Sequence, residues 1–273
     1  MKNTAQITKA MEMVAVSKLR KVQTAVQQAK PYIAKMEEML ADLAPSARFV
    51  KHPLLENRPV KKTGYLVITS DRGLAGPYNS QLLRKLHNEL RHVDPSKYVI
   101  YVIGRKGRDF LKRNNYALAN EIIGLEDTPR YATVAPLAAE IVESYAKQEF
   151  DELYFVYNEF VNMVTQRPLI KKVIPLSRDG GEGQKTSRPN YLFEPDEEAV
   201  MTNLLPKYAE SLLYQAVLDA KAGEHAARMN AMSNANDAAI EMIDDLTLAL
   251  NRARQAAITT QIVEVVSGAQ ALQ

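Results

Sequence analysis

A long stretch near the C-terminus contains no proline and a single glycine. It runs from Lys207 to Ser267, and most of its residues favour a helix. One helix of that length would extend for about 90 Å at ~1.5 Å per residue, which is too long to be buried in a compact domain of this size. The first 43 residues have the same helical composition and are interrupted only by Pro31. The sequence therefore predicts two long helices, one at each end of the chain, that form a rod.

Apolar residues in both terminal stretches recur at alternating intervals of three and four, which is the heptad spacing of coiled coils. Each seam needs a partner, and we expect the two helices to pack antiparallel because the chain leaves through one and returns through the other. Ordinary packing of these helices on a globular core remains an alternative. The N-terminal seam comprises Ala15, Leu19, Val22, Val26, Ala29, Ile33, Met36, Leu40 and Leu43, and the C-terminal seam comprises Met229, Met232, Asn236, Ala239, Ile243, Leu246, Leu250, Ala253 and Ala257.

Charge is distributed unevenly along the chain, although the formal net charge is only +3. Glu12 is the only acid before Glu37, so the first helix is basic. This surface is either simply solvated or a contact for nucleic acid, anionic lipid or an acidic protein. No apolar run approaches the ~20 residues that span a bilayer, and the N-terminus lacks a signal peptide. The basic residues of the first helix are Lys2, Lys9, Lys18, Arg20, Lys21, Lys30 and Lys35.

Between Lys61 and Pro206, short β-branched runs alternate with helical stretches, which predicts a small domain with a mostly parallel sheet. We expect strands at 65–69, 98–103, 121–123, 153–158 and 163–174, and helices at 78–91, 106–114 and 136–148. The fold class is then α/β: a long antiparallel coiled coil of N- and C-terminal helices plus a small Rossmann-like α/β domain. The expected divisions are 1–60 for the first helix and connector, 61–195 for the α/β domain and 196–273 for the last helix.

The sequence offers no convincing catalytic, cofactor or metal site. Thr69–Gly76 lies where a phosphate loop would lie, after a strand and before a helix, but it lacks both G-x-x-x-x-G-K-[ST] and G-x-G-x-x-G, so we expect a tight turn. The histidines, His52, His87, His92 and His225, are scattered, and the chain has no cysteine. We therefore expect no active site, no cofactor and no metal.

Three segments together resemble one protein family. They are Gln6–Lys18, Ile68–Asn79 and Glu224–Thr259, and their combination in this order is specific. The chain resembles the gamma subunits of bacterial F-type ATP synthases over essentially its full length. Members of that family normally extend further at the N-terminus, so we expect the C-terminal helix to be unpaired beyond Met1.

The resemblance implies a rotating central stalk that transmits torque between a membrane rotor ring and a catalytic ring of alpha and beta subunits. It implies the alpha, beta and epsilon subunits and the membrane c-ring as partners, with no nucleic acid and no direct small-molecule substrate. It also implies a peripheral position on the cytoplasmic face of the bacterial cell membrane. The alternatives are a nucleic-acid-binding accessory protein with a basic coiled-coil arm and a tethering scaffold.

Three contact regions follow from the resemblance and the seam spacing. The expected catalytic-ring contacts form one polar band outside the seam, with Lys9 and Lys18 on the first helix and Arg252, Arg254 and Gln255 on the facing helix. Met11 is expected separately, where the stalk passes the beta subunits. The expected bearing is the tip from Ile258 to Leu272, which presents Ile258, Ile262, Val265 and Val266. The expected contacts with the rotor ring and epsilon are Tyr191, Phe193, Glu194 and Asp196.

Overall fold

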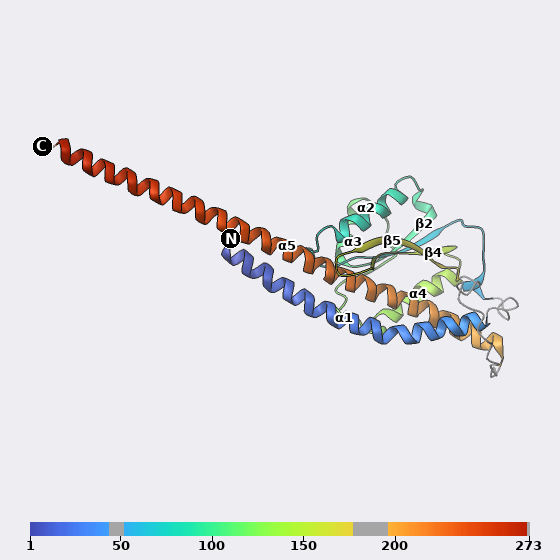
Figure 1. Ribbon diagram of the computed structural model, residues 1–273. Coiled ribbons are helices and arrows are strands. Elements are labelled where there is room, and N and C mark those ends of the chain that lie inside the picture. Colours follow the sequence, from blue (N-terminus) through green and yellow to red (C-terminus); the bar gives the residue numbers. More distant parts are fainter. Residues whose placement is uncertain (44–51, 177–195, 272–273) are drawn as a thin grey trace.

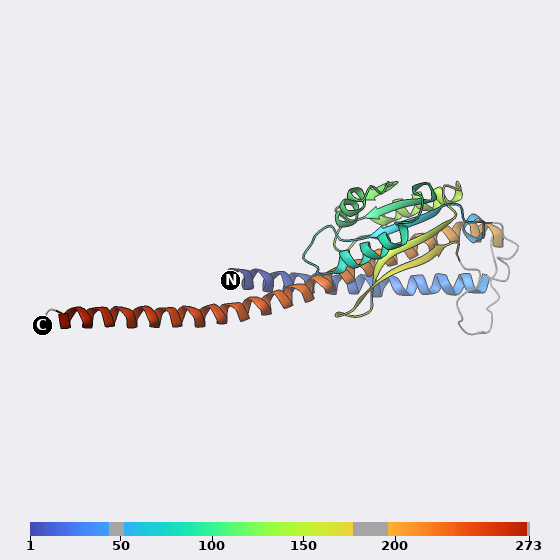
Figure 2. The same cartoon turned by 90° about the horizontal axis from the view of Figure 1, so that it is seen from above.

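The computed structural model describes residues 1–43, 52–176 and 196–271. Two long helices, α1 (Lys2–Leu43) and α5 (Glu197–Ala271), lie side by side, and we call this pair the rod (Figure 1). A small α/β domain flanks the rod at one end, while α5 continues alone beyond the N-terminus of α1 (Figures 1 and 2). At 75 residues, α5 is about 112 Å long.

The expected antiparallel pairing is confirmed. Leu19 of α1 packs in one cluster with Ala226 of α5, whereas Met36 lies beside Ser211, so the two helices run in opposite directions. The seam is buried on α1 at Ala15, Leu19, Val22, Ile33 and Met36, and on α5 at Met232 and Ala239.

Farther along α5 the predicted seam has no partner. Leu246 is 55% exposed and Leu250 is 59% exposed, and Ala253 and Ala257 are exposed as well. The heptad spacing continues there, but among the described residues α1 does not extend alongside this part of α5. The alternative of ordinary core packing holds for the first part of α5, where Leu205, Leu213 and Val217 are buried against the α/β domain.

The α/β domain is built on one five-stranded sheet with the order β3-β2-β1-β4-β5. The first four strands are parallel and β5 is antiparallel to β4, so the expected mostly parallel sheet is confirmed. Pro168 lies in the edge strand β5. Proline is tolerated there because the outer side of an edge strand forms no hydrogen bonds with a further strand. The strands are β1 (Thr63–Ile68), β2 (Tyr98–Ile103), β3 (Asn120–Ile122), β4 (Glu152–Phe160) and β5 (Gln166–Ile174).

Helices cover both faces of the sheet (Figure 1). Residues Val67, Ile100 and Val156 form a core with α2 and α3, and the alternate residues Leu66 and Tyr101 form a second core with α4 and α5. One segment of α5 is therefore both a layer of the domain and half of the rod. The remaining helices are α2 (Tyr78–Leu90), α3 (Arg105–Arg113), α4 (Tyr131–Ala146) and the short 3₁₀ helices η2 (Pro53–Leu55) and η3 (Pro95–Lys97).

Two predicted boundaries were wrong. The helix expected from Pro136 begins at Tyr131, because the proline sits inside α4 rather than in its first turn. The strand expected from Met163 begins at Gln166, because the residues before it form the turn of the β4–β5 hairpin. Within the described ranges, no helix combines the length and the apolar character needed to cross a bilayer.

Candidate functional site

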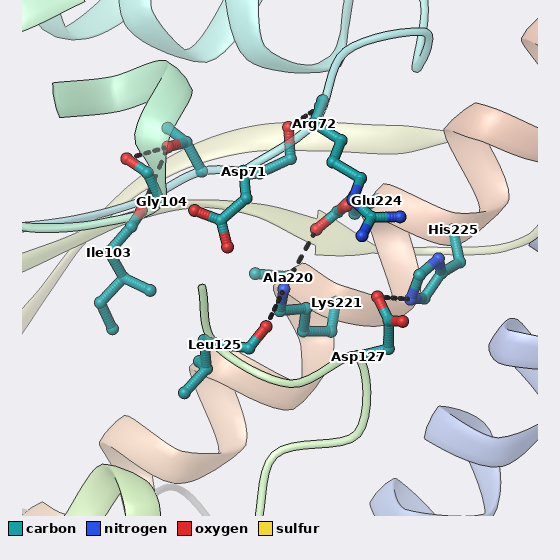
Figure 3. Close-up of polar contacts among 12 residues, drawn as sticks. Asp71, Arg72, Ile103, Gly104, Leu125, Asp127, Ala220, Lys221, Glu224 and His225 are labelled. Carbon is teal, nitrogen blue, oxygen red and sulfur yellow. Dashed lines mark hydrogen bonds and ion pairs between the residues drawn. The ribbon is translucent and has the colours of Figure 1, made fainter. Parts of the chain in front are cut away.

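Where α5 passes the carboxyl ends of the parallel strands, four of its ionisable side chains lie on one face and are largely shielded from solvent. Figure 3 shows three of them, Lys221, Glu224 and His225. Lys221, Glu224, His225 and Arg228 recur at intervals of three and four, so they lie on the same side of the helix. Their side chains are only 6%, 6%, 1% and 11% exposed. Charged side chains are rarely buried to this degree unless they are paired. We call these four residues, together with Lys18 of α1 and Asp127, the joint.

The joint connects α5 to two loops of the α/β domain. Lys221 Nζ donates to the carbonyl oxygen of Leu125 at 3.3 Å and lies 3.5 Å from Glu224 Oε2. The guanidinium of Arg228 bonds to Glu224 Oε1 at 2.8 Å and to the carbonyl oxygen of Gly73 at 3.4 Å. Leu125 follows β3 and Gly73 follows β1, so α5 is held at the ends of two strands that lie on either side of β2.

Asp127 links the two helices of the rod. One carboxylate oxygen lies 2.7 Å from Lys18 Nζ of α1, and the other lies 3.5 Å from His225 Nε2 of α5 (Figure 3 draws the second contact). Burial alone would raise the pKa of Asp127, but the hydrogen bond from Lys18 and the charges around it hold that pKa below its usual value. Asp127 is therefore ionised at neutral pH and forms an ion pair with Lys18.

His225 is the most deeply buried member of the joint. Burial lowers its pKa to about 4, although the negative charges of Glu224 and Asp127 act in the opposite direction. The imidazole is therefore neutral at pH 7, and its Nε2 has no hydrogen-bond partner among the described residues. The attraction between Asp127 and His225 is consequently weaker than that between Asp127 and Lys18.

The loop after β1 makes the tight strand-to-helix turn that the sequence predicts. The Ser70 N–H donates to Asn79 Oδ1 at 3.0 Å, and the Asp71 carboxylate accepts from the N–H groups of Arg105 at 2.9 Å and Gly124 at 3.0 Å. Its polar groups thus bind other groups of the same chain. Across the described ranges, no three His, Asp or Glu side chains are grouped to hold a metal ion.

The chain's own helix crosses the position where open α/β sheets bind ligands. That position lies outside the carboxyl ends of the strands, where the strand order reverses, which here is between β1 and β4. The Tyr78 hydroxyl donates to the carbonyl oxygen of Ala220 at 2.6 Å, and Asn158 Nδ2 donates to the carbonyl oxygen of Tyr78 at 2.9 Å. A Cβ on Gly223 would lie 3.3 Å from the Tyr78 ring, so α5 packs directly on this crevice.

The structure does not bring the expected polar band together. Lys18 lies close to the level of Ala226, because its neighbour Leu19 packs in that cluster. Arg252 lies ~39 Å beyond Ala226 along α5, because a helix rises by ~1.5 Å per residue. Lys18 is also paired with Asp127, and Lys9 with Glu12 at 3.1 Å. The expectation of a single band across facing helices was therefore wrong: α1 does not reach the level of Arg252, Arg254 and Gln255, all of which are exposed.

Of the other expected contact residues, the structure describes the bearing residues, Asp196 and Met11. Ile258, Ile262, Val265 and Val266 are 49–71% exposed on the unpaired end of α5. Tyr191, Phe193 and Glu194 lie outside the described residues. Asp196 is exposed and caps α5, since its Oδ1 accepts from the Ala199 N–H at 2.8 Å. Met11 is half-buried on α1.

Sequence reasoning missed the joint. Asp127 lies in a loop without helical or strand periodicity, and nothing local connects it with Lys18 or His225. A signal did exist on α5, where Lys221, Glu224 and Arg228 share one face between small residues. Charged residues inserted at core spacing among alanines indicate a buried polar contact.

The ATP synthase family matches residues 1–272 of the chain. A curated relative, the ATP synthase gamma chain of Brevibacillus brevis, is 49% identical over 272 residues, which cover 99% of this chain and 94% of the relative.

Solved structures give the same result. The structure of the central stalk and c-ring of Tetrahymena thermophila mitochondrial ATP synthase contains a chain that matches with 26% identity and a TM-score of 0.65, covering 84% of this chain and 99% of that chain. A chain in Euglena gracilis mitochondrial ATP synthase matches with 18% identity and a TM-score of 0.60, covering 97% of this chain and 95% of that one, which supports the fold alone.

Proposed function

Because the chain belongs to the family of ATP synthase gamma chains and forms the central stalk of the rotor, we propose that its two helices carry torque between the membrane rotor ring and the catalytic ring. In this proposal the alpha and beta subunits surround the unpaired end of α5, and the epsilon subunit and c-ring contact the end that carries the α/β domain. The assembled complex is membrane-associated, and the chain is a peripheral subunit on the cytoplasmic face of a bacterial cell membrane.

The observation that carries this proposal is the apolar, unpaired end of α5. Ile262, Val263, Val265 and Val266 are each 51–71% exposed, and successive residues on a helix point about 100° apart. These four side chains span an arc of about 160° around the helix axis, so they form one broad apolar stripe, with Glu264 on the opposite side. The stripe is exposed, and no described helix can cross a bilayer. A partner subunit that covers the stripe, such as the inner wall of the catalytic ring, fits these observations.

We propose separate roles for the regions that the sequence singled out. Arg252, Arg254 and Gln255 lie on the unpaired segment and are available to acidic loops of the catalytic ring, as are Lys9 and Met11 near the start of α1. Ile258, Ile262, Val265 and Val266 form the bearing inside the ring. Tyr191, Phe193, Glu194 and Asp196 contact the rotor ring and epsilon.

We also propose that the chain has no active site of its own. The polar groups of the loop after β1 bind other groups of the same chain, and α5 packs across the ligand crevice of the sheet. Nucleotide chemistry then belongs to the partner subunits. The alternative, a nucleic-acid-binding arm, has less support, because Lys18 on α1 is paired with Asp127 of the chain itself and the chain belongs to a family of ATP synthase subunits.

The proposal is tested by installing this chain as the only gamma subunit of a bacterial ATP synthase in inverted membrane vesicles. We expect ATP-driven proton pumping, and we expect the purified chain alone to hydrolyse no ATP. The control is the same complex assembled without any gamma subunit. An assembled complex that hydrolyses ATP without pumping protons, or a purified chain with its own hydrolysis, would contradict the proposal.

A further inference from the structure

We infer that the joint is the place where torque passes from the α/β domain into both helices of the rod, and that Asp127 is its positioning residue. This inference rests on the proposed function and adds the residues that carry the load. It concerns how the α/β domain is attached to the rod, and this attachment is a separate question from which other subunits the rod contacts.

Apolar contacts alone are poorly suited to this task. Hydrophobic attraction has no fixed direction, so a helix packed through smooth aliphatic side chains resists rotation about its own axis only weakly. The α1 seam beside the joint consists of such residues, including Ala15, Leu19 and Val22. Hydrogen bonds and ion pairs weaken steeply when their geometry is distorted, so polar links far from the helix axis oppose such a rotation.

The loop that carries Asp127 is fixed on both sides of that residue. Asp71 accepts from the Gly124 N–H at 3.0 Å, and Lys221 donates to the Leu125 carbonyl oxygen at 3.3 Å. Beyond Asp127, the Tyr214 hydroxyl donates to the Pro129 carbonyl oxygen at 3.1 Å. The loop therefore cannot shift without breaking contacts to the sheet edge or to α5, and a displacement of the domain is transferred to the carboxylate of Asp127.

Asp127 passes that displacement to α1 through its ion pair with Lys18, at 2.7 Å. On the α5 side it lies 3.5 Å from the neutral His225, which makes no hydrogen bond there, so Lys221 carries the link from this loop to α5 through the Leu125 carbonyl oxygen. Arg228 provides a parallel link from α5 to the loop after β1 through the carbonyl oxygen of Gly73. α5 is thus held by several polar links, whereas Asp127 adds an ion pair to the apolar contacts that α1 makes with α5 and Phe160, so loss of this carboxylate affects α1 most.

The test uses the complete ATP synthase with its catalytic ring immobilised and stalled by a non-hydrolysable nucleotide. A probe on the α/β domain reports the angular fluctuation of the domain relative to the ring. Asp127→Asn keeps the shape of the side chain and removes its charge, and we expect a roughly twofold increase in angular variance. We also expect a lower ratio of ATP-driven proton pumping to ATP hydrolysis. Lys18→Met removes the same ion pair from α1 and should have the same effect.

Two matched variants separate torque transfer from general destabilisation. Glu126→Gln removes one negative charge from the same loop, but Glu126 is exposed and pairs only with Arg130 among the described residues. Ile141→Val weakens the core under α4 and should lower the unfolding temperature without touching the joint. We expect both variants to keep the wild-type angular variance.

Reversal of the ion pair completes the experiment. Lys18→Glu alone should increase the angular variance, and Lys18→Glu combined with Asp127→Lys should return it towards the wild-type value. If Asp127→Asn and Lys18→Met fluctuate as the wild type does, or if Ile141→Val fluctuates as much as they do, the inference is overturned. Failure of the wild-type complex to pump protons when it is supplied with ATP would instead contradict the proposed function.

Discussion

The backbone of Gly223 lies against the ring of Tyr78, so a Cβ on residue 223 would stand only 3.3 Å from that ring. It would also stand 3.4 Å from the carbonyl oxygen of Asn158. This close approach lets α5 cross the carboxyl ends of the parallel strands and accept the hydrogen bond from Tyr78. A larger side chain at this position would push the rod away from the α/β domain.

Gly223→Leu should therefore destabilise the chain. We expect a loss of about 1–3 kcal/mol in the free energy of unfolding, as is usual for overpacking at a tight contact. Gly268→Leu is the matched control on the same helix, since no atom lies within 4 Å of a Cβ built there. Urea unfolding of the two variants checks this, and equal midpoints would show that the contact at residue 223 tolerates a side chain.

His225 should make stability depend on pH. The unfolded chain takes up a proton at this residue near its ordinary pKa of 6.5, whereas the folded chain resists protonation down to about 4. The free energy of unfolding should therefore fall as the pH falls from 6.5 to 4, by at most ~3 kcal/mol at 1.36 kcal/mol per pKa unit. His225→Gln cannot take up this proton and should lose less stability over the same range.

Urea unfolding at pH 7, 6, 5 and 4 compares the wild type with His225→Gln. His92→Gln is the control, because His92 is exposed. Parallel stability curves for the wild type and His225→Gln would be inconsistent with a buried neutral imidazole in the joint.

Asp219 should act in the opposite direction. Burial raises its pKa to about 6, although Lys30 and Lys171 partly offset this. The folded chain therefore carries a costly charge above pH 6, and that cost disappears as the pH falls from 6 to 3.8. Asp219→Asn should stabilise the chain by about 1–3 kcal/mol at pH 7 and by less at pH 4.

The exposed Asp237 of the same helix supplies the control, as Asp237→Asn. Urea unfolding at pH 7 and pH 4 gives both comparisons. A stabilisation at pH 7 that is equal in the two variants, or absent in Asp219→Asn, would mean that burial does not penalise the Asp219 carboxylate.

The rod was largely predictable from sequence because its pairing follows a local rule. Leu19 and Val22 recur at heptad spacing, and so do Met232 and Ala239, and all four are buried. The same spacing continues to Leu250, which is exposed, because periodicity indicates a face and does not say whether a partner covers it. The predicted start of α4 was wrong because it was placed at Pro136, since proline is commonest in the first turn of a helix.

The joint was not predictable in this way. Lys18 and Asp127 come from distant parts of the sequence, and their contact depends on how the loop after β3 folds over the rod. A lysine on a basic helix normally suggests a solvated surface or an external partner. In this chain Lys18 is instead paired with Asp127 of the same chain. Long-range polar contacts leave no periodic signal, so only the folded chain reveals them.

Shortening the chain after Ala257 should spare the fold and damage the assembly. The removed residues Ile258, Ile262, Val265 and Val266 are exposed, so in the part of the chain that the structure describes their side chains contribute little to the fold. We expect an unchanged unfolding midpoint for the isolated chain, but a less heat-stable complex with impaired turnover, because the ring loses its apolar bearing. Wild-type assembly and rates after heat challenge would identify this segment as a dispensable tail.

Direct observation of rotation tests the central claim most sharply. The chain has no cysteine, so Asn88→Cys on the exposed surface of α2 gives a unique attachment point for a probe on the α/β domain. With the catalytic ring of the assembled enzyme fixed to a surface, we expect ATP to drive stepwise rotation of the probe in one direction. ATP hydrolysis at the normal rate with a stationary probe would contradict the conclusion that this chain is the rotating stalk.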